Sequence, residues 1–372
     1  MIFTTDKESL LNKIKTVEKI TVQRGIQPVL ANILFETEKN NLKLSATDLD
    51  ISIITNTTAA VKEEGKITLP ARKIFEIVSK LPDKPVDFTL NKDTNIVTIK
   101  CGNSKFEVKG ISAEEFPKII EDEKELSEKE GININTEPFI KSIKYTVYSA
   151  ANYESRNIIS GVFCKIDDKT IEMAATDGNR LTRISEKIQN KTDKESKIVI
   201  PSKTMNEFLR VSSIINEDNL TLIVSNKKVI FKAKDYVLIS RLLEGEYPLY
   251  QQLIPKTTAN KVKVKKESLI NAIDRVSCMI DDRTNIIKLI LNDGKLMLKA
   301  ETHDAGTSEE VIEADYKGDE FIIAFNYKFI YDFIKTIDCE NAIMEFNSNQ
   351  SATVFKPDSK DDYICLIMPL KI

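Results

Sequence analysis

The segment LKLSATDLDISI (residues 42–53) recurs in similar form as IEMAATDGNRLTRI (171–184) and, with weaker similarity, as LMLKAETHDAGTSEE (296–310). Aligned on their shared threonines, Thr47, Thr176 and Thr302, the copies lie 129 and 126 residues apart. A unit of this length is far longer than a solenoid repeat, so each copy can bury a hydrophobic core of its own. The repeat therefore predicts tandem domains of one fold.

Two further markers recur in the same order and at nearly the same spacing. Because unrelated matches would not keep both order and spacing, we predict three homologous domains over residues 1–125, 126–254 and 255–372. The two markers are KESLLNKIKTV (7–17), TEPFIKSIKYTV (136–147) and KKESLINAIDRV (265–276), and then KITLPARKIFEIVSKL (66–81), KIVIPSKTMNEFLRVS (197–212) and FIIAFNYKFIYDFIKTI (321–337).

Each domain is expected to contain two helices and roughly eight strands. Apolar residues at helical intervals, such as Leu10, Ile14 and Val17, predict the helices, and β-branched runs such as IVTIKCG predict the strands. Two layers of this kind give an α+β fold. The predicted helices cover residues 7–21, 71–81, 136–151, 202–211, 265–280 and 327–338.

Composition favours a soluble cytoplasmic protein. The chain has 372 residues, of which 41% are hydrophobic and 30% are charged, and no apolar run reaches about 18 residues. The five cysteines are scattered without the spacing of a zinc or redox motif, and the N-terminus does not resemble a signal peptide. We expect no membrane partner, cofactor or metal.

Charge is divided unevenly between the elements. The formal net charge is −3, but the six predicted helices together carry +7, which leaves −10 on the rest of the chain. Such a protein can present a cationic face to phosphates while its exterior stays anionic. An excess of lysine as a solvated helix former would produce the same numbers. Charge alone leaves both interpretations open.

Catalytic motifs are scarce. The sequence contains no phosphate-binding glycine loop and no metalloprotease motif, and its single histidine, His303, has no triad signature beside it. The acidic residues Asp48, Asp50 and Asp177 keep one enzymatic alternative open, a metal-dependent phosphoryl-transfer enzyme. Since Asp50 has no counterpart in the second copy, we favour solvated turns over a metal site.

Four stretches together resemble the bacterial DNA polymerase sliding clamp, the β subunit. The similarity runs along the whole chain in collinear order. The stretches are LPARKIFEIVSKLP (69–82), AATDGNRL (174–181), GEYPLYQQLIP (245–255) and the terminal IMPLKI (367–372).

The resemblance implies a ring-shaped homodimer that encircles duplex DNA without reading its sequence, with helices around the hole and sheets outside. Such a ring confers processivity and catalyses no reaction. The segment NYESRNIISG (152–161) departs from the family pattern, at Asn157 and Ile158 among others. The DNA-facing candidates are Arg24, Arg72, Lys73, Tyr153, Lys203, Arg210, Arg283 and Lys328.

Ring closure is expected to be head to tail, with the first domain of one chain meeting the third domain of the other. Edge strands can complete one sheet across two subunits. The expected interface residues are Ile77, Phe106, Val108, Cys278 and Met279.

The resemblance also implies a hydrophobic groove for extended peptides of the replicative polymerase, the clamp loader and other proteins that carry a clamp-binding motif. An apolar slot with a few orienting polar groups suits such a ligand. At two positions, Asn179 and Gln252, the chain departs from the frequent family residues. The groove residues are Ile159, Thr176, Gly178, Asn179, Arg180, Leu181, Pro248, Gln252, Leu253, Leu366, Ile367, Met368, Pro369, Leu370, Lys371 and Ile372.

AATDGNRL is therefore interpreted as part of a peptide dock rather than a catalytic loop. Asp177 is expected to stabilise the turn that shapes the dock. The first copy, SATDLDIS, shares the turn but lacks the glycine and the arginine.

Overall fold

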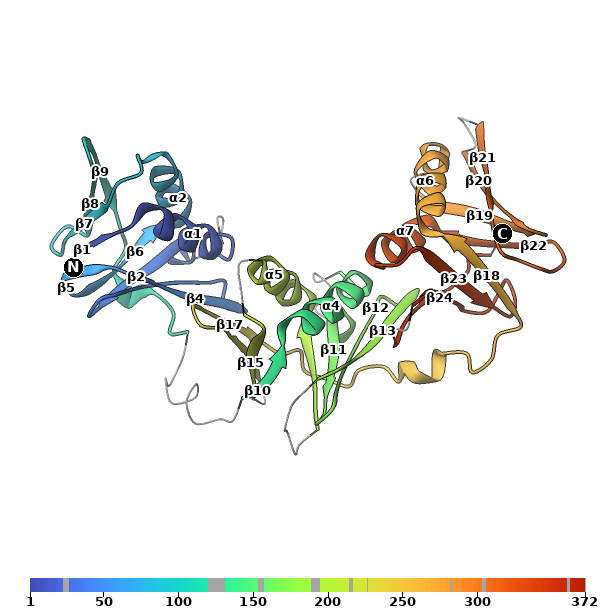
Figure 1. Ribbon diagram of the computed structural model, residues 1–372. Helices are drawn as coiled ribbons and strands as arrows, with labels where there is room; N and C mark the ends of the chain where they lie inside the picture. Colours follow the sequence, from blue (N-terminus) through green and yellow to red (C-terminus); the bar gives the residue numbers. More distant parts are fainter. Residues whose placement is uncertain are drawn as a thin grey trace. The chain divides into compact units, whose positions relative to one another are not determined.

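The computed structural model describes residues 1–22, 27–119, 131–152, 157–188, 195–213, 217–225, 227–281, 283–302, 306–359 and 362–371. Within these ranges the chain forms six α-helices and 25 strands in an α+β arrangement (Figure 1). None of the described helices combines the length and the low charge that a transmembrane helix needs.

The helices begin within one residue of their predicted starts, and five of the six end before the predicted residue, whereas α5 extends one residue further. They are α1 (Lys7–Glu18), α2 (Ala71–Lys80), α4 (Thr136–Thr146), α5 (Ser202–Ser212), α6 (Lys266–Val276) and α7 (Tyr327–Thr336). The predicted ends of the second and third opening helices are separate 3₁₀ turns, η3 (Val147–Ser149) and η7 (Ser277–Met279). Pro70 is the N-cap residue of α2 and directly precedes its first residue. A proline there limits how far the helix extends backwards.

The strands form four sheets. The first, of five strands, has the order β5 (Ala60–Glu63), β1 (Ile2–Thr5), β7 (Val86–Asn91), β8 (Ile96–Cys101) and β9 (Ser104–Lys109). The last, of four strands, has the order β21 (Gly306–Glu313), β20 (Lys295–Thr302), β19 (Ile286–Asn292) and β22 (Phe321–Asn326). In both of these sheets an edge strand, β9 or β21, has a neighbour on one side only.

Two eight-stranded sheets each combine strands from adjacent repeats, because β17 pairs with β4 and β25 pairs with β13, both antiparallel. One has the order β10 (Ile132–Asn135), β15 (Asn219–Val224), β16 (Lys228–Lys232), β17 (Tyr236–Arg241), β4 (Ile51–Thr58), β3 (Asn41–Thr47), β2 (Asn32–Glu38) and β6 (Gly65–Pro70). The other has the order β14 (Ser196–Pro201), β11 (Gly161–Ile166), β12 (Thr170–Thr176), β13 (Arg180–Lys187), β25 (Asp362–Ile367), β24 (Thr353–Pro357), β23 (Asn341–Phe346) and β18 (Asn260–Lys265).

Sheet sharing explains why the contacts within the chain separate two compact units rather than three. One unit is Met1–Ile134 with Arg210–Leu242, and the other is Asn135–Leu209 with Leu243–Ile372. The β17–β4 pairing draws half of the second repeat into the first unit, and the β25–β13 pairing keeps the other half in the second.

Each repeat packs its helices over its own strands. In the first unit α1 contacts α2, β3 and β4, and in the second α6 contacts α7 and β21 (Figure 1). The buried faces are those that the apolar spacing predicted, with Leu10, Ile14 and Val17 fully buried on α1. Aromatic pairs tie the layers together, for example Phe139 of α4 edge-on to Phe208 of α5 at 5.3 Å between ring centroids.

Candidate functional site

The turn that joins β12 to β13 is built by its own side chains. Asp177 accepts hydrogen bonds at Oδ1 from the backbone nitrogens of Asn179 (2.9 Å) and Arg180 (3.0 Å). The Thr176 hydroxyl donates to the carbonyl of Arg180 at 2.6 Å and accepts from the amide of Gly178 at 3.1 Å. These are the local bonds by which Asp and Thr fix tight turns. The structure thus agrees with the turn-forming role predicted for Asp177.

The first repeat contains the same turn between β3 and β4. Asp48 Oδ1 accepts from the amides of Asp50 (3.0 Å) and Ile51 (2.6 Å), and the Thr47 hydroxyl donates to the carbonyl of Ile51 at 3.1 Å. The carboxylates of Asp48 and Asp177 therefore accept hydrogen bonds from backbone amides of their own turns. Among the described residues, no group of three or more His, Cys, Asp or Glu side chains has the arrangement of a metal site.

Arg180 begins β13 and is largely enclosed, with 11% of its side chain exposed. Its Nε donates to Asp177 at 3.0 Å, its Nη1 to Asp332 of α7 at 2.6 Å, and its Nη2 to the carbonyl of Tyr148 at 2.5 Å. The guanidinium also lies over the Phe329 ring, 4.6 Å from its centroid. Arg180 thus links the turn to η3 and α7.

Electrostatics keep the guanidinium of Arg180 charged. Burial by itself lowers its pKa, but the hydrogen bond to Asp332 and the charges of Asp177 and Asp332 outweigh this effect, so the pKa is raised. Nearby, the Tyr148 and Tyr363 hydroxyls share a hydrogen bond of 2.6 Å. Burial raises the pKa of both tyrosines, so both remain protonated.

An apolar cluster lies beside the turn, on the second eight-stranded sheet. Its buried members are Ala174, Leu181, Tyr250, Val354 and Leu366, and Phe163, Tyr247, Ile254 and Ile364 pack against them. Tyr250 belongs to η6 (Tyr250–Leu253) and donates its hydroxyl to Glu172, which also pairs with Arg183 at 2.7 Å. The segment that follows β17 is thereby held on the sheet.

The C-terminal tail runs along the same turn. In the β25–β13 pairing Leu366 stands opposite Leu181, and the amide of Met368 then donates to the carbonyl of Asn179 at 2.9 Å. Two residues later Leu370 donates to the carbonyl of Ala324, on β22, at 2.8 Å. The tail therefore stays hydrogen-bonded beyond the last strand.

Apolar side chains remain open to solvent around this cluster. The exposed fractions are 72% for Leu249, 61% for Leu253 and 44% for Met368. Large exposed apolar groups beside a buried aromatic cluster are typical of a binding surface. Gly178, Asn179, Pro248, Gln252 and Lys371 are exposed as well.

Of the sixteen predicted groove residues, the structure brings those of the turn at 176–181 together with those at 366–368, and Leu181 and Leu366 share the apolar cluster with Tyr250. Leu181, Leu366 and Ile367 are buried, so their side chains are not open to a ligand. Ile159 is half-buried in η5 (Ile158–Ser160), as are Thr176, Pro369 and Leu370, and Ile372 lies outside the described residues. The prediction missed Leu249, Tyr247, Tyr250 and Asp332. The motif GEYPLYQQLIP contained the first three, whereas no local signal pointed to Asp332.

Of the predicted DNA-facing cations that the structure describes, all but one lie on helices. Arg72 and Lys73 are exposed on α2 and pair with Glu76 at 3.3 and 3.0 Å. Lys203 is exposed on α5, and Lys328 is exposed on α7. The exception, Arg283, pairs with Asp281 at 3.1 Å. Arg24 and Tyr153 lie outside the described residues.

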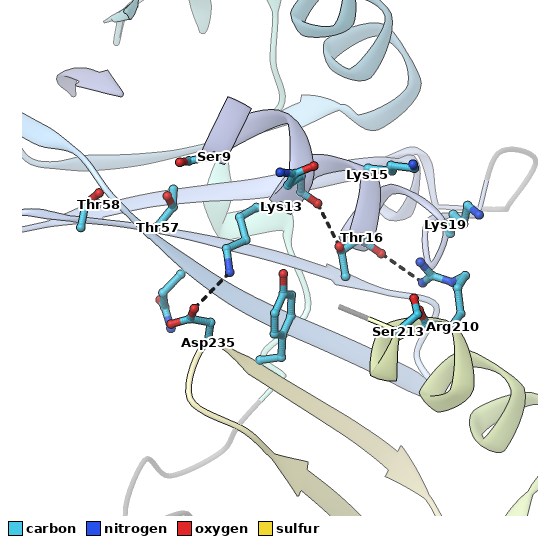
Figure 2. Close-up of a pocket in the computed structure, with 13 residues that line it drawn as sticks. Ser9, Lys13, Lys15, Thr16, Lys19, Thr57, Thr58, Arg210, Ser213 and Asp235 are labelled. Carbon is cyan, nitrogen blue, oxygen red and sulfur yellow. Dashed lines mark hydrogen bonds and ion pairs between the residues drawn. The ribbon is translucent and has the colours of Figure 1, made fainter. Parts of the chain in front are cut away.

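A cleft of about 730 Å³ in the first unit contains Arg210 and three lysines, Lys13, Lys15 and Lys19 (Figure 2). Arg210, on α5, donates to the carbonyl of Thr16 at 3.1 Å and thereby binds the C-terminal end of α1. Lys13 points to Asp235, 3.5 Å away, and lies over the Tyr236 ring at 4.1 Å. Positive charge exceeds negative charge in this cleft.

Comparison with solved structures defines the class of this fold. A beta sliding clamp from C. crescentus superposes with a TM-score of 0.93 at 28% identity and covers 100% of this chain and 99% of its own. The Bacillus subtilis DNA polymerase sliding clamp gives 0.92 at 27%, with the same coverage. The fold is that of the sliding clamps.

Sequence comparison gives the family. Models of the DNA polymerase III beta subunit match in chain order, the N-terminal domain over residues 1–120, the central domain over 133–249 and the C-terminal domain over 251–371. The beta sliding clamp of Synechocystis is 30% identical over 98% of both chains, and that of Synechococcus elongatus is equally similar. The chain belongs to the DNA polymerase III beta subunit family.

Family membership confirms the prediction made from the four sequence stretches. The protein is a sliding clamp, a non-catalytic processivity factor of DNA replication, built as an α+β chain of three clamp domains. The alternative phosphoryl-transfer enzyme that would use Asp48, Asp50 and Asp177 is not supported.

Proposed function

We propose that two copies of this chain close head to tail into a ring around duplex DNA and that each copy holds replication proteins in the groove beside Gly178. The domains of the proposed ring are residues 1–125, 126–254 and 255–372. The observation that carries the proposal is the way in which consecutive repeats share their sheets.

Within the chain, the last strand of one repeat pairs with the strand after the Thr-Asp turn of the preceding repeat. β17 of the second repeat pairs with β4, and β25 of the third pairs with β13. The equivalent strands left over are β9 of the first repeat and β21 of the third, and each lies at the edge of its sheet. Pairing β9 of one copy with β21 of another would repeat the same junction and leave neither edge open.

The two edges also have complementary properties. β9 exposes Phe106 (37%) and β21 exposes Val311 (50%), and β9 carries Lys105 and Lys109 while β21 carries Glu309, Glu310 and Glu313. Opposite charges and apolar groups across two antiparallel edges favour pairing.

The five predicted interface residues divide by exposure. Phe106 and Cys278 are exposed and Met279 is half-buried. Ile77 (9%) and Val108 (7%) are buried within their own domain. In the proposed interface the first three make contact, and Ile77 and Val108 shape the surface beneath Phe106.

We propose DNA as a partner because of the positive side chains on the helices and in the cleft around Arg210. Arg72, Lys73, Lys203, Arg210 and Lys328 stand on the helices that carry the positive excess, and the cleft around Arg210 adds Lys13, Lys15 and Lys19. Contacts to phosphates do not read sequence, so a ring that uses them can slide. Arg24, Tyr153 and Arg283 complete the proposed DNA-facing set.

The protein partners are proposed to be the replicative polymerase, the clamp loader and other proteins with a clamp-binding motif. An extended apolar peptide would contact Leu253 and Met368 and would be oriented by the backbone around Gly178 and Asn179. A cytoplasmic location follows from the replicative role, and the proposed activity needs no cofactor or metal.

Light scattering coupled to size exclusion, without DNA, tests ring closure. We expect the mass of a dimer at micromolar concentration. A monomer under those conditions would contradict the head-to-tail ring.

A further inference from the structure

We propose that Asp332 of α7 is a positioning residue for the peptide groove and acts on it through Arg180. The inference rests on the proposed function, since it concerns how that groove is held in shape. It also changes the role of Arg180, which the resemblance to the clamp family implied as a residue of the groove itself.

The burial of Arg180 argues against direct contact. Only 11% of its side chain is exposed, and its three guanidinium nitrogens donate to Asp177, Asp332 and the carbonyl of Tyr148. A peptide that replaced any of these three partners would have to break a charge-assisted or buried hydrogen bond in a partly desolvated place.

An uninterrupted series of hydrogen bonds leads from Asp332 to the exposed groove. Asp332 accepts from Arg180 at 2.6 Å, and Arg180 donates to Asp177 at 3.0 Å. Asp177 accepts from the amide of Asn179 at 2.9 Å, and the carbonyl of Asn179 accepts from the amide of Met368 at 2.9 Å. Met368, at the end of the series, is 44% exposed.

The third repeat thereby supports a turn of the second. Asp332 and Phe329 of α7 both contact the guanidinium, as do the carbonyl and the ring of Tyr148 of η3. The equivalent turn of the first repeat has Ile51 where Arg180 stands, so it lacks this link. Of the two equivalent turns that the structure describes in full, the one beside the groove is tied to a helix of the next repeat through an arginine.

The test uses the full-length chain with Asp332→Asn, which keeps the shape of the side chain and removes its charge. Asp293→Asn, in the exposed β19–β20 hairpin of the same repeat, is the matched control. We expect Asp332→Asn to weaken binding of the purified replicative polymerase by about tenfold, the low end for a hydrogen bond to a charged group. Binding by Asp293→Asn should equal that of the wild type.

Two further readouts separate positioning from general destabilisation. Hydrogen exchange at the Met368 amide should speed up in Asp332→Asn, while dimer mass and retention on circular DNA should stay at wild-type values. Arg180→Lys should act in the same direction because an ammonium cannot span Asp177, Asp332 and the Tyr148 carbonyl together. The double variant Arg180→Lys with Asp332→Asn should bind no more weakly than the worse single variant.

The proposal is overturned if Asp332→Asn leaves both polymerase binding and Met368 exchange unchanged. It is equally overturned if dimer mass and DNA retention fall in proportion to polymerase binding, since that pattern would show a purely structural role. Failure of the wild type to bind polymerase would contradict the proposed function, whereas Met368 exchange would still report on the link from Asp332.

Discussion

Leu49 and Gly178 occupy the same position in two equivalent turns, and both have a positive backbone φ, 80° and 93° respectively. This conformation strains any residue with a Cβ and suits glycine. A Cβ built on Gly178 has no atom within 4 Å, so the cost of a side chain there comes from the backbone rather than from a clash.

Gly178→Ala should therefore destabilise the second turn, whereas Leu49→Gly should relieve strain in the first. We expect the alanine variant to lose about 1 kcal/mol of apparent unfolding free energy and to bind polymerase more weakly. Leu49→Gly should be neutral or slightly stabilising, because the relief offsets the added freedom of the unfolded chain. Urea unfolding of both variants checks this, and equal changes of the same sign would contradict it.

Removal of Met368–Ile372 should abolish polymerase stimulation and leave the dimer intact. The deleted segment includes the exposed Met368 but no residue of β9, β21, η7 or α2. Primer extension on long templates measures the first effect and light scattering the second. Stimulation equal to that of the full chain would show that the groove is elsewhere.

Phe106→Cys should form a covalent dimer with Cys278 of a second copy when a short bismaleimide is added. Both positions are exposed, and in the proposed junction β9 approaches β21 beside η7. A denaturing gel shows the product. The control adds Cys278→Ser to Phe106→Cys and should give monomer only; a dimer band of equal strength in this control would refute the pairing.

The double variant Arg72→Ala with Lys73→Ala should weaken DNA retention at moderate salt and flatten its salt dependence. Each lost phosphate contact lowers the slope of log affinity against log salt by about 0.9. Lys169→Ala, in the exposed β11–β12 turn, is the matched control and should behave as wild type. If both variants lose retention equally, net charge rather than the α2 face governs binding.

The lowered pKa of Asp167 predicts that the stability of the fold depends on pH. Hydrogen bonds from the Lys169 amide and the Thr170 backbone and side chain lower its pKa below the ordinary value of 3.8. Because the pKa is lowered on folding, the stabilisation is fully present above the unfolded pKa and is lost as pH falls through the folded one. Asp167→Ala should thus be less stable than wild type at neutral pH, and the difference should shrink below about pH 4.

Urea unfolding at several pH values gives that difference. Asp168→Ala, one residue away and more exposed, serves as its control and should show little effect. If the difference in unfolding free energy between Asp167→Ala and wild type were as large at pH 3 as at neutral pH, the stabilisation would not come from the ionised Asp167 carboxylate.

The sequence was sufficient for the fold because the signal came from repetition. Three copies of one pattern averaged out the ambiguity of any single helix or strand, and the caps at Asp6 and Asn326 agree with the predicted starts. The sharing of sheets was not predicted, since the partners of β4 and β13 lie more than 170 residues away along the chain.

Arg180 shows which feature of the site could not be predicted from the sequence. The resemblance to the sliding-clamp family placed Arg180, two residues after Gly178, among the residues of the peptide groove. Its enclosure depends on Asp332, 152 residues away, and on the carbonyl of Tyr148. The local sequence around Arg180 contains no information about these hydrogen-bond partners, because they approach the guanidinium only when η3, β13 and α7 meet in the fold.

The rate at which the protein dissociates from DNA tests most directly whether it encircles DNA as a closed ring. Labelled protein is assembled by the clamp loader onto nicked circular plasmid, and its dissociation is followed before and after a restriction enzyme cuts the circle. A topological ring predicts slow release from the circle and rapid release from the linear product, because a closed ring leaves only at an end. Equal release rates from circular and linear DNA would contradict encirclement.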